Sequence, residues 1–299
     1  MKKLLINISL VIAAIVAMGT FEVSAQEAKT LFLYPQIPDS ITNIDARYDY
    51  YVSHFWDRAN TKAVFSSKKR FADAFEDFVV PLRYATADTV HASVKKFMSS
   101  LEKQPNDMLY VGQLAEDLLY SDSALYVSDE LYLDFIKPIL RNKRIDRNLK
   151  ARYESQYIRL NNTLQGRPMA AIPYTNAADS TMVLEPRPGV PLIIFLSDPE
   201  CTDCRLAGTR LKADGRTAQL VEAGLVDVAV ISAVEPDDAA WREYAKSFPE
   251  TWIVGTNPQL DMIIDMRGGT PSFYILDEAG RIAVKNINVD TVLAIMSRM

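Results

Sequence analysis

The chain has 299 residues, of which 48% are apolar and 24% are charged. This length and composition are typical of a globular protein with two domains. The formal net charge is −5 and no block of basic residues is present. We therefore do not expect nucleic acid or an anionic membrane surface as a partner.

The first 25 residues predict a cleaved export signal. Lys2 and Lys3 form a basic start, residues 4–19 an apolar core, and residues 23–25 a cleavage site of small side chains. An uncleaved membrane anchor is the alternative, but this apolar run is shorter than the roughly 20 residues that a spanning helix needs. No cysteine follows the core, which excludes lipid attachment at this site. We expect an exported, periplasmic protein that begins at Gln26.

Apolar side chains recur with helical spacing from about residue 39 to residue 163. They predict helices near residues 44–56, 71–80, 90–101, 111–119, 129–140 and 147–160. No internal repeat is present, so we predict an all-α helical bundle domain over residues 26–163 rather than a solenoid. Its aromatic side chains are interpreted as core and interface residues.

The composition changes near Gly166, where short β-rich runs begin to alternate with helical patterns. The apolar runs 191–197 and 226–234 predict strands that are buried on both faces, with one helix between them. Residues 272–285 predict an antiparallel hairpin, and a closing helix follows. Residues 164–299 are therefore expected to form an α/β domain in which helices flank a mixed sheet.

Cys201 and Cys204 are the two cysteines of the chain, and Thr202 and Asp203 separate them. In an exported protein such a pair tends to form a disulfide. Cys201 follows a buried strand and opens a helix, whose dipole favours the thiolate that acts as nucleophile in disulfide exchange. Cys204, one turn later, is expected to resolve the mixed disulfide that Cys201 makes. Arg205 supports the thiolate, whereas the acidic neighbours oppose it: Asp198, Glu200 and Asp203.

A metal site and a structural disulfide are the alternatives for this pair. Zinc or iron needs about four ligands, and the two histidines, His54 and His91, lie in the helical part. A disulfide that closes so short a loop removes little chain entropy and adds little stability. We therefore predict a redox pair that uses neither a metal nor another cofactor.

Three features of residues 164–299 resemble the thioredoxin fold, and in particular the exported TlpA-like thiol–disulfide oxidoreductases. They are a strand and a helix around "DPECTDC", the segment "GRPMAAIPYTNAADSTMVL" with two short strands, and the Thr-Pro peptide before the hairpin in "RGGTPSFYILDEAGRIAVK". The helical part resembles the uncharacterised helical domain that precedes such modules in some exported bacterial proteins.

The resemblance also implies site residues. Pro271 matches the cis-proline that faces the cysteines in that family, so Thr270 and Pro271 are expected to position an extended client; the alternative is a proline that starts an edge strand. Glu235 is a candidate proton shuttle by fold analogy, although a solvated loop is a slightly better interpretation. Arg267 lies on the approach to this groove, where its charge would steer an acidic client.

Two departures from the family bear on the chemistry. Glu200 replaces the aromatic residue that usually precedes the first cysteine, and Thr202-Asp203 is the dipeptide between the cysteines. Acidic residues beside the nucleophile favour a reducing pair over a strong oxidant. We expect a periplasmic reductant or isomerase of client protein disulfides, regenerated by a membrane-linked thiol partner. The alternative is a non-catalytic binding protein in which the thioredoxin-like half is a scaffold and the helical half binds a partner; a peroxidase is disfavoured.

Overall fold

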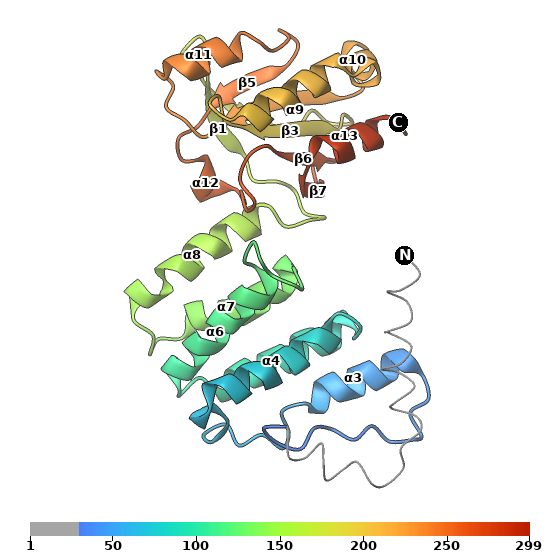
Figure 1. Ribbon diagram of the computed structural model, residues 1–299, viewed down its shortest axis with the longest axis vertical. Coiled ribbons are helices and arrows are strands. Elements are labelled where there is room, and N and C mark those ends of the chain that lie inside the picture. The colour runs from blue at the N-terminus through green and yellow to red at the C-terminus, as the bar shows by residue number, and fades with distance from the viewer. Residues whose placement is uncertain (1–29) are drawn as a thin grey trace. The chain divides into compact units, whose positions relative to one another are not determined.

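The computed structural model describes residues 30–299 (Figure 1), so the predicted signal peptide lies outside the described residues. The chain divides into two compact units, one that ends at Leu118 and one that runs from Leu119 to Met299. This division groups the last two helices of the predicted helical domain with the sheet. The predicted boundary between residues 163 and 164 stays a prediction.

The first unit is helical, as the apolar spacing predicts. Its elements are α3 (Ile44–His54), η1 (Val64–Ser66), α4 (Lys68–Leu82), α5 (Ala87–Ser100) and nearly all of α6 (Pro105–Leu119). The Asn43 side chain begins α3 by accepting a hydrogen bond from the Ala46 N–H at 2.9 Å. Aromatic side chains form the core: Phe55 and Phe78 are fully buried, and Trp56 stacks on Phe97 with ring centroids 4.2 Å apart.

The second unit contains a mixed sheet of seven strands in the order β2-β1-β5-β4-β3-β6-β7. The strands are β1 (Ile172–Asn176), β2 (Thr181–Leu184), β3 (Leu192–Ser197), β4 (Asp227–Ser232), β5 (Ile253–Thr256), β6 (Ser272–Leu276) and β7 (Ile282–Ile287). The central strands β3, β4 and β5 are parallel, whereas β1, β2, β6 and β7 pair antiparallel with their neighbours. This architecture confirms the predicted mixed sheet and its C-terminal hairpin.

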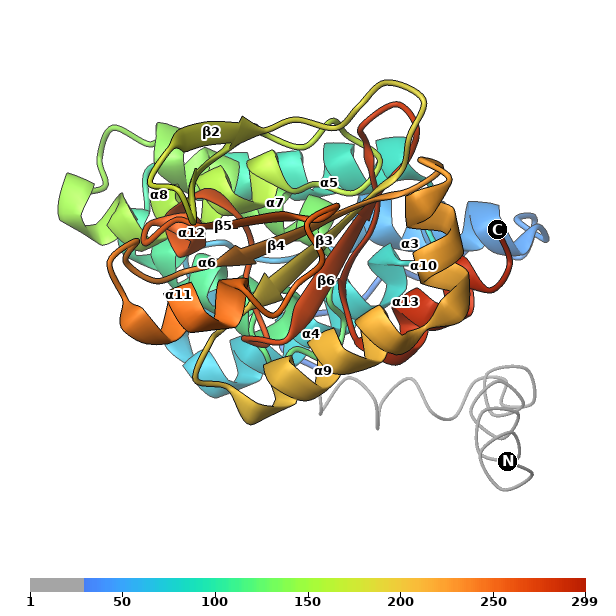
Figure 2. The ribbon, with the colours of Figure 1, turned by 90° about the horizontal axis from the view of Figure 1, so that it is seen from above.

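Both faces of the sheet are covered, which explains why its central strands are apolar throughout. Ile193 and Phe195 of β3 pack into one core with side chains from α9 (Thr202–Ala213), α10 (Gly215–Glu222) and α13 (Val289–Met296), which lie along that face (Figure 2). The alternate β3 residues Ile194 and Leu196 pack into a second core on the other face, together with Leu260 of α12 (Leu260–Ile263).

Two helices, rather than the one predicted, connect β3 to β4. Asp214 ends α9 with an extended backbone, and its carboxylate accepts the Thr217 N–H at 2.8 Å, which begins α10. An aspartate at this position caps a new helix more readily than it continues the old one. The next crossover, between β4 and β5, carries α11 (Ala239–Ala245).

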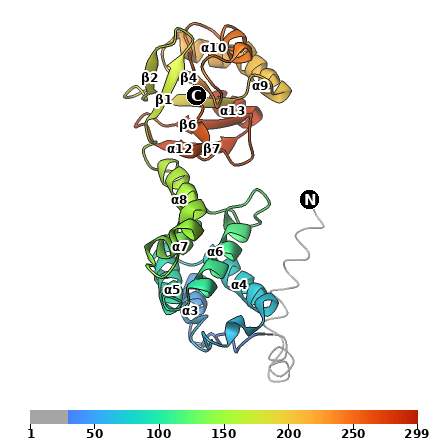
Figure 3. The same cartoon turned by 90° about the vertical axis from the view of Figure 1, so that its left-hand side faces the viewer.

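The helices α7 (Asp129–Arg141) and α8 (Arg147–Asn162) belong to the second unit and lie side by side (Figure 3). Ser128 and Asp146 provide their N-caps, as side chains that accept the Leu131 and Asn148 N–H groups. Among residues 30–299, no helix combines the length and the apolar character that crossing a membrane requires.

Gly255 of β5 lies against the ring of Tyr174 on the neighbouring strand β1. A Cβ atom at position 255 would lie 2.2 Å from Tyr174 Cδ2, a distance that forces the ring or the strand to move. We expect Gly255→Ala to lower the free energy of unfolding by about 1–3 kcal/mol, measured by urea denaturation. Gly215→Ala is the matched control, because a Cβ there meets nothing within 4 Å; an equal loss in both variants would contradict this account.

Candidate functional site

Cys201 is the N-cap residue of α9, directly after the turn that follows β3. Its sulfur accepts the backbone N–H of Cys204 at 3.1 Å, and its carbonyl accepts that of Arg205 at 3.2 Å. The preceding turn is closed by Asp198, whose carboxylate accepts the Glu200 N–H at 2.8 Å. The prediction that Cys201 opens a helix is therefore confirmed, and its sulfur lies at the positive end of the α9 dipole.

The two sulfurs differ in their exposure to solvent. Cys204 is fully buried in the core beneath α9, whereas Cys201 is only partly buried at its edge. Burial raises the pKa of the Cys204 thiol to about 11, and its hydrogen bond with Cys201 adds to the rise, while bonds with the Asp198 backbone and the Thr270 side chain counter it. Cys204 therefore stays protonated at neutral pH, and Cys201 is the sulfur that a reactant can reach.

The Thr270–Pro271 peptide is cis, as the family resemblance implies. It directly precedes β6, which pairs antiparallel with β3 so that Ser272 lies opposite Leu196. This register brings the carbonyl oxygen of Thr270 to 3.8 Å from the Cys201 sulfur, which donates to it. Cys201, Cys204 and Thr270 therefore meet at one end of α9, with Pro271 next in the chain.

Glu235 lies exposed in the loop after β4, where its carbonyl accepts the Asp238 N–H at 3.2 Å. Its role as proton shuttle stays a prediction. Arg205 is also exposed, and its guanidinium donates to the Glu200 carbonyl at 3.3 Å, beside Cys201 in the chain.

The surroundings of Arg267 do not support the expected steering of an acidic client. Its side chain is only 15% exposed and is paired with the carboxylates of Asp129 and Asp265. Because the carboxylates neutralise the guanidinium charge and burial shields it, Arg267 does not present a free positive charge to an acidic client.

Tyr244 of α11 is a site neighbour that the sequence pattern does not single out. Its hydroxyl lies 2.6 Å from the Ser197 hydroxyl at the end of β3, and its ring packs edge-on against Phe248. Burial raises the pKa of Tyr244 to about 12, and the nearby sulfurs of the cysteine pair contribute to the rise. The Tyr244 hydroxyl reaches the sulfurs only through the path of the β4–α11 crossover. No local sequence motif therefore predicts that Tyr244 lies at the site.

Both histidines belong to the first unit, whereas the cysteines belong to the second. His54 of α3 is 45% exposed, with Nδ1 2.6 Å from an oxygen of Asp57, and His91 of α5 is also exposed. Over residues 30–299, no group of three or more histidine, cysteine or acidic side chains is placed to hold a metal ion.

Comparison with known proteins finds similarities for both parts of the chain. Residues 18–162 match the family model described as a domain of unknown function (DUF5106). No curated protein is significantly similar to the chain. A thioredoxin-like protein from Bacteroides caccae superposes with a TM-score of 0.69 at 20% identity, over 89% of this chain and 98% of that one.

Two further solved structures align with less than half of the chain. One is the C-terminal domain of an uncharacterised protein from Bacteroides fragilis, with a TM-score of 0.41 and 21% identity over 46% of this chain and 99% of that one. Another is the thioredoxin domain of a thiol–disulfide oxidoreductase from Bacteroides vulgatus, with a TM-score of 0.37 and 17% identity over 45% of this chain and 96% of that one. The likeness to the Bacteroides caccae protein shows the fold, in which a thioredoxin-like domain follows a helical part. The helical part is the one that the DUF5106 model matches.

Proposed function

We propose that this chain, in which a DUF5106 helical domain precedes a thioredoxin-like domain, is a thiol–disulfide oxidoreductase that acts on client proteins. One observation carries the proposal: the Cys201 sulfur is partly exposed at the N-terminus of α9, within 3.8 Å of the Thr270 carbonyl that precedes the cis-proline. A reactive sulfur, a buried second sulfur and an open backbone segment are the parts that exchange with an extended client requires.

The reaction follows from the difference between the two sulfurs. The Cys201 thiolate attacks one sulfur of a client disulfide, which forms a mixed disulfide and releases the other client sulfur as a thiolate. Cys204 then gives its proton to the client thiolate released in the first step and attacks the Cys201 sulfur, which releases the second client sulfur as a thiolate. The client gains two electrons, and the protein is left with a Cys201–Cys204 disulfide.

The client is held by backbone groups in this proposal. Pro271 has no N–H, and the Thr270 carbonyl beside it accepts the Cys201 thiol at 3.8 Å. Once that thiol loses its proton, the carbonyl can pair with an extended client strand. Such main-chain pairing accepts many sequences, which suits a reductant or isomerase with several clients. We further propose that the protein is exported to the periplasm and that a membrane-linked thiol partner reduces the Cys201–Cys204 disulfide again.

Insulin reduction by dithiothreitol tests the proposed function. We expect the protein without residues 1–25 to accelerate the precipitation of insulin chains, and Cys201→Ser to reduce the rate to that of dithiothreitol alone, because the nucleophile is lost. Thr209→Ser is a matched control on the same helix, since serine retains the hydroxyl that donates to the Arg205 carbonyl. Equal rates for wild type and Cys201→Ser would reject the oxidoreductase proposal and favour the alternative of a non-catalytic binding protein.

A further inference from the structure

The loop between α12 and β6 ends at Thr270 and Pro271, and its shape is set by side chains that precede them. Gly268 and Gly269 both have positive φ angles, of 78° and 73°, a conformation that glycine adopts without strain. Two successive glycines leave the backbone of this loop few restraints of its own. The position of Thr270 therefore depends on how the residues before the glycines are anchored.

Arg267 provides the main anchor of this loop. Its guanidinium donates to the Asp265 carboxylate at 2.6 and 2.9 Å and to the Tyr120 carbonyl at 2.9 Å, and it also donates to Asp129. The guanidinium carbon lies 4.3 Å from the centre of the Tyr120 ring, a cation–π contact. Arg267 thus joins the loop to the chain around the start of α7.

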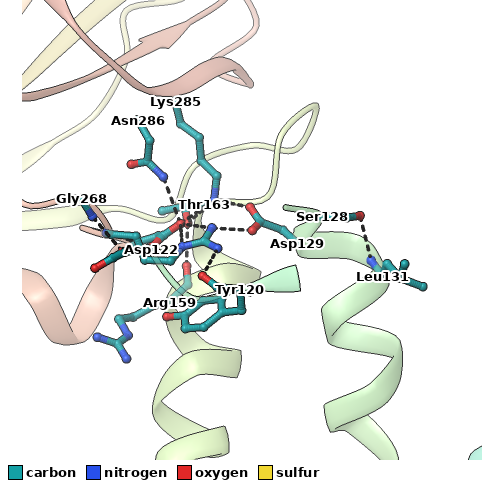
Figure 4. Close-up of polar contacts among 12 residues, drawn as sticks. Tyr120, Asp122, Ser128, Asp129, Leu131, Arg159, Thr163, Gly268, Lys285 and Asn286 are labelled. Atoms are coloured by element: carbon teal, nitrogen blue, oxygen red, sulfur yellow. Dashed lines mark hydrogen bonds and ion pairs between the residues drawn. The ribbon is translucent and has the colours of Figure 1, made fainter. Parts of the chain in front are cut away.

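Two further groups complete the connection (Figure 4). Lys285 of β7 bridges the same two carboxylates, at 2.5 Å from Asp129 and 3.0 Å from Asp265. The carboxylate of Asp122 accepts the Gly268 N–H at 3.3 Å. The four charged side chains are between 1% and 15% exposed and balance each other as two acids and two bases. Neutralising one of these four side chains lowers the free energy of unfolding strongly, because its partner is left as a buried charge without a counterion.

On the basis of the function proposed above, we propose that Arg267 and Asp129 are positioning residues, which hold Thr270 and Pro271 where a client disulfide meets Cys201. Arg267 lies three residues before Thr270, so a loosened guanidinium displaces the backbone with which the client pairs. The Cys201 sulfur itself is held at the N-terminus of α9, where it accepts the Cys204 N–H at 3.1 Å. Loss of the anchor therefore impairs reaction with clients that use the loop and spares small reagents.

Asp129→Asn tests this inference through two reactions of the same sulfur. We expect kcat/KM for insulin reduction to fall about tenfold, mainly through KM. We expect the rate of Cys201 alkylation by iodoacetamide to stay within about twofold of wild type, because this small reagent needs no loop contact. Asp290→Asn is the matched control: it removes one aspartate from the exposed pair with Arg210 and should change neither rate.

A second pair of variants avoids the buried charges. Asp122 is exposed, so Asp122→Ala should fold normally, lose the hydrogen bond to Gly268 and reduce kcat/KM for insulin about threefold. Asp122→Asn keeps an acceptor oxygen and should restore the wild-type value. The inference is overturned if alkylation and insulin reduction fall together, or if neither Asp129→Asn nor Asp122→Ala changes the kinetics of insulin reduction. A wild type that does not reduce insulin rejects the proposed function itself.

Discussion

Replacing Cys204 with serine is expected to trap clients on Cys201 as mixed disulfides. Attack by a sulfur one helical turn away is intramolecular, and its loss should slow client release at least about a hundredfold. Cys201 remains able to react because it is the partly exposed sulfur, whereas Cys204 is fully buried. The variant is incubated with client proteins that contain disulfides, and the adduct is detected by non-reducing electrophoresis. It should appear as a band of higher mass that dithiothreitol removes.

Variants of Cys201 test which cysteine is the nucleophile and which one resolves the mixed disulfide. Cys201→Ser and the double serine variant should form no adduct, since the remaining sulfur of Cys201→Ser lies in the core. An adduct on Cys201→Ser in place of Cys204→Ser would show that the roles of the two cysteines are reversed. If both single variants fold and neither forms an adduct, client exchange through this cysteine pair is contradicted.

Asp265→Asn is expected to lower the free energy of unfolding by about 3–5 kcal/mol, because it leaves the buried charges of Arg267 and Lys285 short of one carboxylate. The Asp265 side chain is 1% exposed, so water cannot replace the lost partner. Denaturant unfolding at pH 7 measures the loss. The exposed pair of Arg210 and Asp290 serves as the control, and Asp290→Asn should change stability little.

The pH dependence of this loss follows from the Asp265 pKa. Burial alone would raise that pKa, but the hydrogen bond from Arg267 and the charge of Lys285 outweigh burial and hold it well below the ordinary 3.8. A carboxyl whose pKa is lowered by folding stabilises the fold above its unfolded pKa, and this contribution is lost as the pH falls through the folded value. The difference between wild type and Asp265→Asn should be complete at pH 7 and shrink below about pH 4. A difference that grows toward acid pH would contradict the assignment.

The elements that sequence could predict are those whose signal is local. Apolar spacing along one face predicts α3 to α8, and continuous apolar runs predict β3 and β4, because packing on one or both faces imposes those patterns. The break between α9 and α10 was missed because a single residue, Asp214, ends one helix and begins the next. The apolar pattern on either side of it is continuous enough to suggest one helix.

The site residues, too, could be predicted where their signal is local and were missed where it is not. The cysteine pair and the helix that it opens are local, and the family resemblance supplied Thr270 and Pro271. Arg267 was misplaced because an arginine beside two glycines has the local appearance of an exposed turn, while its partner Asp129 lies 138 residues earlier in the chain. Tyr244 was missed for the same reason, since its hydroxyl partner Ser197 is 47 residues away.

The four buried charges also bear on where the protein can be divided for expression. A chain that starts at residue 164 keeps Asp265, Arg267 and Lys285 but lacks Asp129, so it would carry one surplus cation in its interior. Starting the recombinant C-terminal half near residue 119 retains the missing carboxylate together with Tyr120. The choice of cloning boundary therefore decides whether the separated half is electrically balanced.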